Sequence, residues 1–173
     1  MEKKQVLLIG FGPLAEKLTE MIAPLGICVR TYGASYLSKT VGELCMEENT
    51  PAPEPAMERG LVLFHHFRQE ELDPVLKILR EAKLSKQPLK AMVTATNRHW
   101  KAENLIGELQ QEQELMGELM KLKKLRDSMP MPAFTDVPAM KARMAAEVQL
   151  SGGEGVTAET IRCAYRELSK FAE

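Results

Sequence analysis

The sequence predicts an α/β fold: two strand-helix-strand units forming a four-stranded, largely parallel sheet, followed by a long helix and a helical C-terminal region. Three observations indicate this class. Short apolar runs suited to buried strands alternate with stretches of helical periodicity, the pattern begins again after residue 60, and an uninterrupted charged stretch follows the last strand. Since a helix connects the two strands of each unit, we expect those strands to be parallel.

Composition divides the 173-residue chain into four segments. We expect a first α/β unit over residues 1–45, a linker over 46–59, a second α/β unit with the long helix over 60–128 and a helical C-terminal extension over 129–173. The linker, MEENTPAPEPAMER, carries three prolines and several carboxylates, which favour neither a helix nor a strand. We therefore expect it to bury nothing.

The first unit begins with a strand over 5–9, an apolar run that the GFGP turn ends. Apolar residues at helical spacing predict a helix over about 14–24, and Gly26 stands where a helix C-cap belongs. The β-branched and aromatic residues of ICVRTY (27–32) predict a second strand. SYLSKTVGEL (35–44) is compatible with a short helix or a loop.

The second unit shows the same succession. LVLFHHF (61–67) predicts a strand, apolar residues at helical spacing between 72 and 79 predict a helix, and LKAMVTAT (89–96) predicts another strand. The long helix is expected over 101–127. Its first half is acidic and its end basic, which is the order that the helix dipole favours.

Two shorter helices are expected in the C-terminal extension. The segment MPMPAFTDVP ends the long helix, and a short helix follows over 139–148. A last amphipathic helix is expected over about 158–171, with Thr157 as its N-cap. Its inward face comprises Ile161, Ala164, Tyr165, Leu168 and Phe171.

The two halves of the α/β region resemble each other. VLLIGF aligns with LVLFHHF, so that Phe11 corresponds to Phe67, and TVGEL (40–44) corresponds to LIGEL (105–109). This similarity predicts an internal repeat of one strand-helix-strand unit.

Bulk properties argue against several functional classes. A net charge of −1 and a pI near 6.4 argue against a nucleic-acid binder that relies on overall positive charge. No stretch approaches the ~18 apolar residues of a membrane span, and the three cysteines, without CxxC spacing, predict neither a disulfide framework nor a zinc site. We therefore expect a cytoplasmic protein with reduced thiols and without membrane association, metal or cofactor.

The glycine turn after the first strand admits two interpretations. Gly10, Gly12 and Ala15 fit the G-x-G-x-x-A pattern of dinucleotide-binding domains, and Arg30 stands at the end of the next strand, where it would suit a 2′-phosphate. The corresponding segment of the second half, HHFRQE, has no phosphate-loop character. We therefore favour a plain strand-to-helix turn. A nucleotide- or dinucleotide-binding, Rossmann-like enzyme or sensor is the alternative.

A candidate ligand cleft lies at the strand ends, where open parallel sheets bind ligands. We expect it to comprise Phe11, His65, His66, Thr94, Thr96, Asn97 and Trp100. The structural alternative is that the segment 94–100 only guides the chain into the long helix, with Asn97 as an N-cap or Asx-turn residue. His65 and His66 are adjacent on a strand, so we expect their side chains on opposite faces and not on one metal.

One resemblance to a known family rests on LVLFHHF…EELDPVLKILREAKL…PLKAMVTATNRHW…ENLIGELQQEQELM. Over about residues 5–118 the chain resembles the bacterial family named domain of unknown function 3783. That family joins an L-D-x-x-L-x-x-L helix and a K-A-[VM]-V-T-x-T-N-x-x-W segment to a long acidic helix. The matching positions are Phe67, Leu72, Asp73, Leu76, Leu79, Lys90, Ala91, Val93, Thr94, Thr96, Asn97 and Trp100. The GFG turn departs from the family's polar-aromatic turn, and the resemblance implies no function.

No catalytic constellation is visible, since the sequence shows neither a nucleophile elbow nor paired carboxylates suited to a pocket. We therefore favour a non-enzymatic binding or protein-interaction module. Its partner would be another protein or a second copy bound through the long helix, because methionine-rich surfaces pack adaptably. For the later turns of that helix we favour burial by the C-terminal helices within residues 139–171, and homodimerisation through the helix is the alternative. The apolar stripe of that helix comprises Leu105, Leu109, Leu115, Met116, Leu119, Met120 and Leu122.

Overall fold

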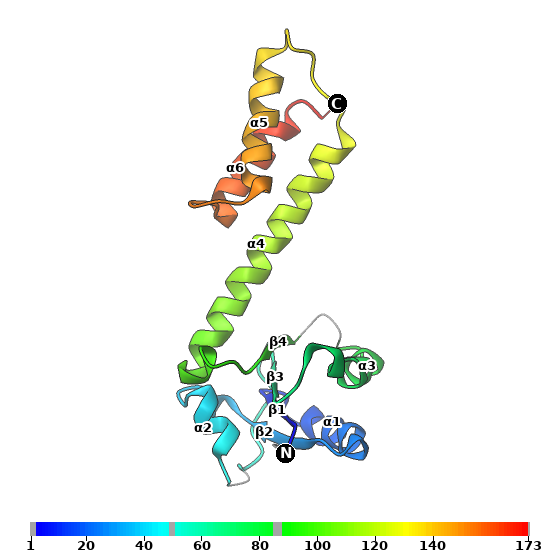
Figure 1. Cartoon of the computed structure of the whole chain (residues 1–173), viewed down its shortest axis with the longest axis vertical. Coiled ribbons are helices and arrows are strands. Elements are labelled where there is room, and N and C mark those ends of the chain that lie inside the picture. The colour runs from blue at the N-terminus through cyan, green and yellow to red at the C-terminus, as the bar shows by residue number, and fades with distance from the viewer. Residues whose placement is uncertain (1–2, 49–50, 85–87, 173) are drawn as a thin grey trace. The chain divides into compact units, whose positions relative to one another are not determined.

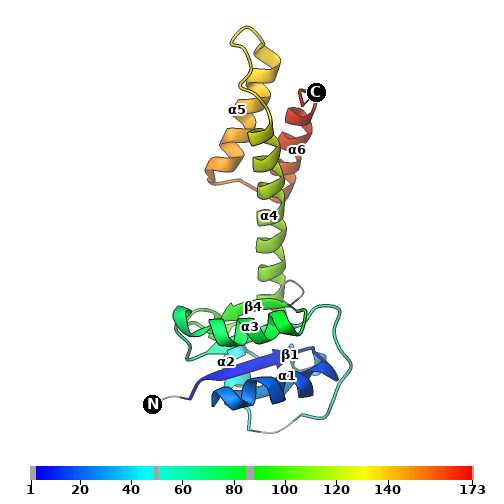
Figure 2. The same ribbon diagram turned by 90° about the vertical axis from the view of Figure 1, so that its right-hand side faces the viewer.

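The computed structural model describes residues 3–48, 51–84 and 88–172. The chain forms two compact units, which we call unit 1 (Met1–Leu109) and unit 2 (Gln110–Glu173). Unit 1 contains a four-stranded sheet with helices on both faces, and unit 2 contains helices alone (Figures 1 and 2). The predicted α/β fold with a long helix and a helical C-terminal region is confirmed.

The sheet is mixed, with its strands in the order β2-β1-β3-β4. The strands are β1 (Gln5–Ile9), β2 (Cys28–Tyr32), β3 (Leu61–His65) and β4 (Leu89–Met92). The pairs β1–β2 and β3–β4 are parallel, as predicted, whereas the central pair β1–β3 is antiparallel, with Gln5 opposite His65 and Ile9 opposite Leu61.

The antiparallel central pair separates the strand ends of the two halves. The carboxyl ends of β1 and β2 lie at one end of the sheet, and those of β3 and β4 lie at the other. The expectation that Phe11 shares an edge with His65 and His66 is therefore wrong. Phe11 follows Ile9, which pairs with the first residue of β3 and not with its last.

Both faces of the sheet are buried. On one face Val6, Leu8, Val62 and Phe64 pack against α1 (Leu14–Ile22) and α3 (Asp73–Glu81). On the other face Leu7, Ile9, Leu61, Leu63 and Leu89 pack against α2 (Val41–Met46) and the first turns of α4 (Ala102–Ser128). Figure 1 shows α1 and α3 on one side of the strands and α2 on the other. Each fully buried aliphatic side chain contributes roughly 1.5–3 kcal/mol, so this double-faced core holds unit 1 together.

Local signals set the ends of the helices in unit 1. Gly26, with φ of 71°, ends the short 3-10 helix Ala23–Leu25 that extends α1. The ambiguous segment 35–44 contains the end of a 3-10 turn, Ala34–Tyr36, and the start of α2. Thr40 caps α2 through a capping box with Glu43, which holds the pKa of the Glu43 carboxyl below its ordinary value. The remaining 3-10 turns are Gln69–Glu71 and Asn97–His99.

Part of the linker packs on unit 1, contrary to expectation. We call residues 51–57 the strap; they form neither helix nor strand. The backbone nitrogen of Met57 donates to the carbonyl of Gly10 (2.9 Å), and the Glu54 carboxylate accepts from the backbone nitrogen of Ser35 (3.1 Å). The partly buried Met57 side chain also packs on the core, so prolines here shape an ordered cover.

Unit 2 contains the later turns of α4 together with α5 (Val137–Ser151) and α6 (Ala158–Ser169). Its core comprises Leu122, Ala142, Ala146, Ile161, Ala164 and Leu168. Thr157 caps α6, as predicted. Tyr165 and Phe171 were expected inward, but both are exposed, because the buried stripe of α6 is narrow and Phe171 lies beyond the end of this helix.

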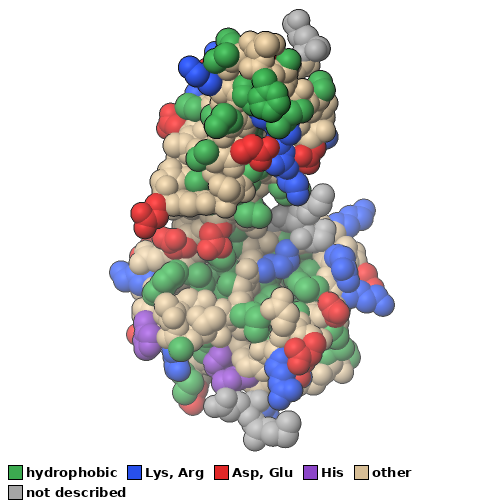
Figure 3. All heavy atoms as spheres, turned by 45° about the horizontal axis from the view of Figure 1, so that its top comes forward, with side chains coloured by type: hydrophobic (Ala, Val, Ile, Leu, Met, Phe, Trp, Pro, Cys, Tyr) green, Lys and Arg blue, Asp and Glu red, His purple; other side chains and the backbone are tan. Residues whose placement is uncertain are grey.

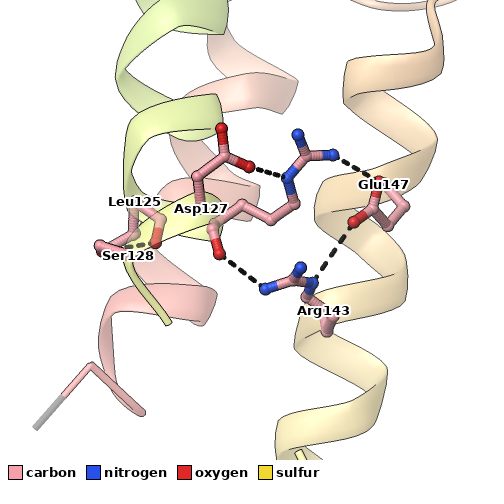
Figure 4. A network of polar contacts seen from close by, with 6 residues as sticks. Leu125, Asp127, Ser128, Arg143 and Glu147 are labelled. Atoms are coloured by element: carbon pink, nitrogen blue, oxygen red, sulfur yellow. Dashed lines mark hydrogen bonds and ion pairs between the residues drawn. The ribbon is translucent and has the colours of Figure 1, made fainter. Parts of the chain in front are cut away.

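A polar network joins α4 to α5 within unit 2 (Figure 4). Nη1 of Arg143 donates to the carbonyl of Arg126 (2.7 Å), and Nη1 of Arg126 donates to the Glu147 carboxylate (2.8 Å). Nε of Arg143 lies 3.3 Å from the same carboxylate. Since Pro130 has no N–H, the Arg126 carbonyl lacks the α-helical donor four residues on. It accepts instead from the backbone nitrogen of Met129 (3.3 Å) and from Arg143 of the next helix.

Candidate functional site

The strand-end segment of the second half is the first candidate site. The backbone nitrogen of Val93 donates to the carbonyl of Phe64 (2.8 Å), so β3 and β4 end side by side. His65 and His66 therefore lie at the same end of the sheet as the polar residues Thr94, Thr96 and Asn97. The structure brings these five candidates to one edge.

Asn97 uses its whole side-chain amide to close the turn after β4. Its Oδ1 accepts from the backbone nitrogen of Thr94 (2.8 Å), and its Nδ2 donates to the carbonyl of Met92 (2.8 Å). The backbone nitrogen of Asn97 in turn donates to Oγ1 of Thr94 (3.1 Å). These reciprocal bonds form a capping box in which Thr94 is the capping residue and Asn97 lies three residues after it, and this differs from the N-cap or Asx-turn role expected of Asn97. Asn97 thus has a structural role in this turn.

The same segment is connected to the start of α2. The carbonyl of Trp100 accepts from the backbone nitrogen of Val41 (2.9 Å), and the backbone nitrogen of Ala102 donates to the carbonyl of Lys39 (3.0 Å). Trp100 is 38% exposed and Thr96 is exposed as well. Thr94, Arg98 and His99 of this segment are exposed too, so a ligand at this edge would also meet their side chains.

The two histidines lie side by side, which corrects the expectation of opposite faces. Their ring centroids are 3.7 Å apart, with an angle of 36° between the planes. The reason is local: β3 ends at His65, and His66 has a positive φ of 62°, so alternation stops there. Nδ1 of His65 lies 3.3 Å from Oε1 of Gln5. Histidine side chains are visible at the surface in Figure 3. The residues that the structure describes contain no group of three or more His, Cys, Asp or Glu side chains placed to hold a metal.

The glycine turn after β1 is the second candidate site. Gly10 and Gly12 have φ values of 79° and 54°, which favour glycine. A Cβ atom on Gly12 would lie 2.6 Å from the backbone nitrogen of Ala56. In a dinucleotide-binding turn the second glycine leaves room for the pyrophosphate. Here the strap occupies the space beside that glycine.

A groove of about 870 Å³ lies next to this turn, between α1, the end of β2 and the strap. Its lining comprises Gly12, Pro13, Ala15, Glu16, Thr19, Glu20, Thr31, Tyr32, Gly33, Pro51, Ala52, Pro53, Glu54 and Pro55. Three of these described lining residues are glutamates and none is Lys or Arg. The local field therefore opposes the binding of a phosphate group.

Arg30 does not join the glycine turn. It pairs with Leu7 in the middle of β2, and the strand ends two residues later at Tyr32. Because side chains alternate along a strand, Arg30 lies on the α2 face with Tyr32, whereas α1 packs on the opposite face. Its Nε is buried, and the described residues offer it no hydrogen-bond partner. The placement of Arg30 at the strand end is thus corrected.

Tyr32 itself is a structural residue at the end of β2. Its hydroxyl donates to the carbonyl of Leu44 (2.7 Å) and ties the strand to α2. Burial raises the pKa of this phenol to about 12, and burial likewise raises the pKa of the Cys45 thiol to about 11. A thiol held protonated in this way is a poor nucleophile.

The surface of unit 2 is the third candidate site. Nine of the twelve exposed large apolar side chains in the described part of the chain belong to it: Met116, Met120, Met131, Phe134, Val137, Met144, Val148, Tyr165 and Phe171. Apolar side chains are visible on the surface of this unit in Figure 3. The sequence predicted a contact role for Met116 and Met120 of the long helix but none for the exposed residues of α5. The signal was present in the spacing of Val137, Met144 and Val148 opposite a row of alanines.

The resemblance found in the sequence is confirmed over part of the chain. Residues 61–116, from β3 into α4, match the family model described as Domain of unknown function (DUF3783). The match leaves out residues 5–60, to which the resemblance also extended. Comparison with curated proteins and with solved structures finds no match. None of the helices in the described residues is both long and apolar enough to cross a bilayer.

Proposed function

We propose that the chain is a non-enzymatic, cytoplasmic protein-interaction module. Unit 2 makes the contact, and the α/β unit serves as its scaffold. The observation that carries this proposal is the concentration of exposed large apolar side chains in unit 2. Phe134 is 91% exposed and Met131 is 71% exposed. The gathering of exposed apolar side chains in one unit supports an interaction site there.

The chemistry of the exposed residues fits a protein partner. Methionine side chains adapt their shape to an apolar surface, and aromatic residues such as Phe134 dominate the energetics of interfaces. The polar network between α4 and α5 holds the two helices in a fixed relationship. A fixed pair of helices loses little conformational entropy when it binds.

A nucleotide in the groove beside Gly12 and Ala15 is the alternative function, favoured by the size of that groove. The carboxylates that line the groove and the strap that packs against Gly12 argue against nucleotide binding. Calorimetric titration of the protein with NADP and with ATP distinguishes the two functions, because the alternative requires saturable heat and the interaction module gives none. The exposed Thr96 and Trp100 support a smaller ligand contact at the strand ends. Quenching of Trp100 fluorescence would report it.

Photo-crosslinking in living cells tests the interaction module. A photoreactive phenylalanine analogue replaces Phe134 in one variant and the exposed Lys77 of α3 in a matched control. We expect protein adducts from position 134 and none from position 77. Equal adducts from both positions, or none from position 134, would contradict the proposal.

A further inference from the structure

The groove beside the glycine turn has polar side chains that accept hydrogen bonds and hardly donate them. Its described side-chain donors are the hydroxyls of Thr19, Thr31 and Tyr32. Two of the three are already hydrogen-bonded, because Thr19 donates to the carbonyl of Ala15 (2.8 Å) and Tyr32 donates to the carbonyl of Leu44 (2.7 Å). The other polar side chains are carboxylates, which only accept when ionised. A ligand of this groove must therefore supply the donors.

The carboxylates stand on two walls of the groove. Glu16 and Glu20 lie one turn apart on α1, roughly 6 Å along the helix axis, and Glu54 belongs to the strap. Within the described part of the chain, neither Glu16 nor Glu20 has a hydrogen bond or an ion pair. Hydrogen bonds from Ser35 lower the pKa of the Glu54 carboxyl, so this group is ionised at neutral pH. The groove thus offers negative charge that awaits a counter-charge.

These carboxylates are too dispersed to share one metal ion. Over residues 3–48, 51–84 and 88–172, no group of three or more His, Cys, Asp or Glu side chains could hold one. The surface between the carboxylates is apolar and includes Pro13, Ala15, Pro51, Ala52, Pro53 and Pro55. Separated negative charges on an apolar surface complement a ligand whose positive charges are separated by methylene groups.

We propose that this groove binds a linear aliphatic polyamine. Amino groups four carbons apart stand roughly 6 Å from each other in an extended chain, which matches the turn between Glu16 and Glu20. The protonated amines donate to the carboxylates, and the methylene groups contact the prolines. The groove volume of about 870 Å³ falls within the usual range of small-molecule sites. The inference goes beyond the protein contact of unit 2 and does not depend on it.

Calorimetric titration of the full chain with spermidine at low ionic strength tests the inference. We expect one saturable site with a dissociation constant on the order of 0.1–1 mM, because exposed ion pairs are individually weak. An amine bound this weakly leaves the protein during desalting. Hexaamminecobalt(III) carries the same triple charge in compact form and cannot reach both walls at once. We expect it to bind about tenfold more weakly than spermidine or worse.

Paired substitutions locate the charge that matters. Glu16→Gln together with Glu20→Gln removes both carboxylates of the α1 wall, and we expect the dissociation constant of spermidine to rise about tenfold. The matched control is Glu108→Gln together with Glu112→Gln, an exposed pair of the same spacing on α4. It changes the net charge equally and should leave the constant within about twofold. Circular dichroism checks that both double variants keep their helices.

Amide chemical shifts recorded during the same titration place the ligand. We expect saturable changes at Glu16, Glu20 and Thr31 and none along α3. Four results would overturn the inference: no saturable heat, equal weakening in the two double variants, hexaamminecobalt(III) binding as tightly as spermidine, or shifts confined to residues outside the groove. None of these results affects the adducts at position 134, which test the proposed function separately.

Discussion

The backbone nitrogen of Ala56 lies 2.6 Å from the point where a Cβ atom on Gly12 would stand. The chain thus approaches its own glycine turn as closely as a cofactor would approach it in a dinucleotide-binding domain. The Met57 side chain stands against Gly10 in the same way. The glycines of GFGPLA therefore serve a tight turn and close self-packing.

We expect Gly12→Ala to destabilise unit 1 by roughly 2–4 kcal/mol. The new methyl group combines the cost of a left-handed backbone with a clash against the strap. Urea unfolding followed by the fluorescence of Trp100 measures the change. The control is Gly26→Ala, which has φ of 71° and nothing within 4 Å of its Cβ position, and should cost about 1 kcal/mol. Equal costs would show that the strap does not cover Gly12.

Asn97→Ala removes both amide hydrogen bonds of the turn after β4. We expect a loss of about 2 kcal/mol in the free energy of unfolding of unit 1, because the backbone of Thr94 and Met92 loses its partners. Thr96→Ala, beside it, removes an exposed hydroxyl that makes no capping bond and should cost less than about 0.5 kcal/mol. If both variants unfold like the parent protein, Asn97 has no structural role, and that result would favour a role for Asn97 in ligand binding.

Arg143→Ala should loosen the junction of α4 and α5. It removes the shorter of the two hydrogen bonds to the Arg126 carbonyl and one cation beside Glu147, at a cost of about 1–2 kcal/mol in the free energy of unfolding. Amide hydrogen exchange of α5, measured by mass spectrometry, reports this locally. Lys123→Ala, an exposed residue of α4, serves as the control. Unchanged protection of α5 in Arg143→Ala would refute the role of the network in Figure 4.

We expect the buried Tyr32 to make the protein less stable at high pH. Burial raises the pKa of its phenol to about 12, so the unfolded chain releases this proton first as the pH rises above 10. The contribution of Tyr32 to the free energy of unfolding is intact below pH 10 and is lost between about pH 10 and 12. The loss amounts to about 1.4 kcal/mol at pH 11.

Urea unfolding of the parent protein and of Tyr32→Phe at pH 9 and pH 11 measures this loss. The variant lacks the hydrogen bond to Leu44 at both pH values. Between pH 9 and pH 11 its free energy of unfolding should fall by about 1.4 kcal/mol less than that of the parent. Cys45 titrates in both proteins and cancels in the difference. Parallel pH profiles would contradict the burial of the Tyr32 hydroxyl.

Local sequence patterns predicted the helices and strands of the fold well. The pairing of the strands and the contacts between distant segments were harder to predict. The strand at 5–9 and the long helix were correctly placed, because a turn and a proline-rich segment bound them. The antiparallel pairing of β1 with β3 was missed. Both strands are buried on both faces, so their uniform apolar runs contain no signal for direction.

The candidate sites depended on features that no single segment encodes. The stacked pair of His65 and His66 results from one left-handed residue, and the cover over Gly12 comes from a linker 44 residues further along the chain. Phe11 and Phe67 each follow their strand by two residues and are buried in the same cluster. The internal repeat that they suggest stays a prediction.

Native mass spectrometry of the full chain as purified tests most directly the claim that this protein works through unit 2 and that its glycine turn is structural. We predict the mass of a dimer, or of a complex with another protein, without a small-molecule adduct. An additional mass of nucleotide size that survives gentle ionisation would contradict the account. It would indicate that the GFGPLA turn binds a nucleotide.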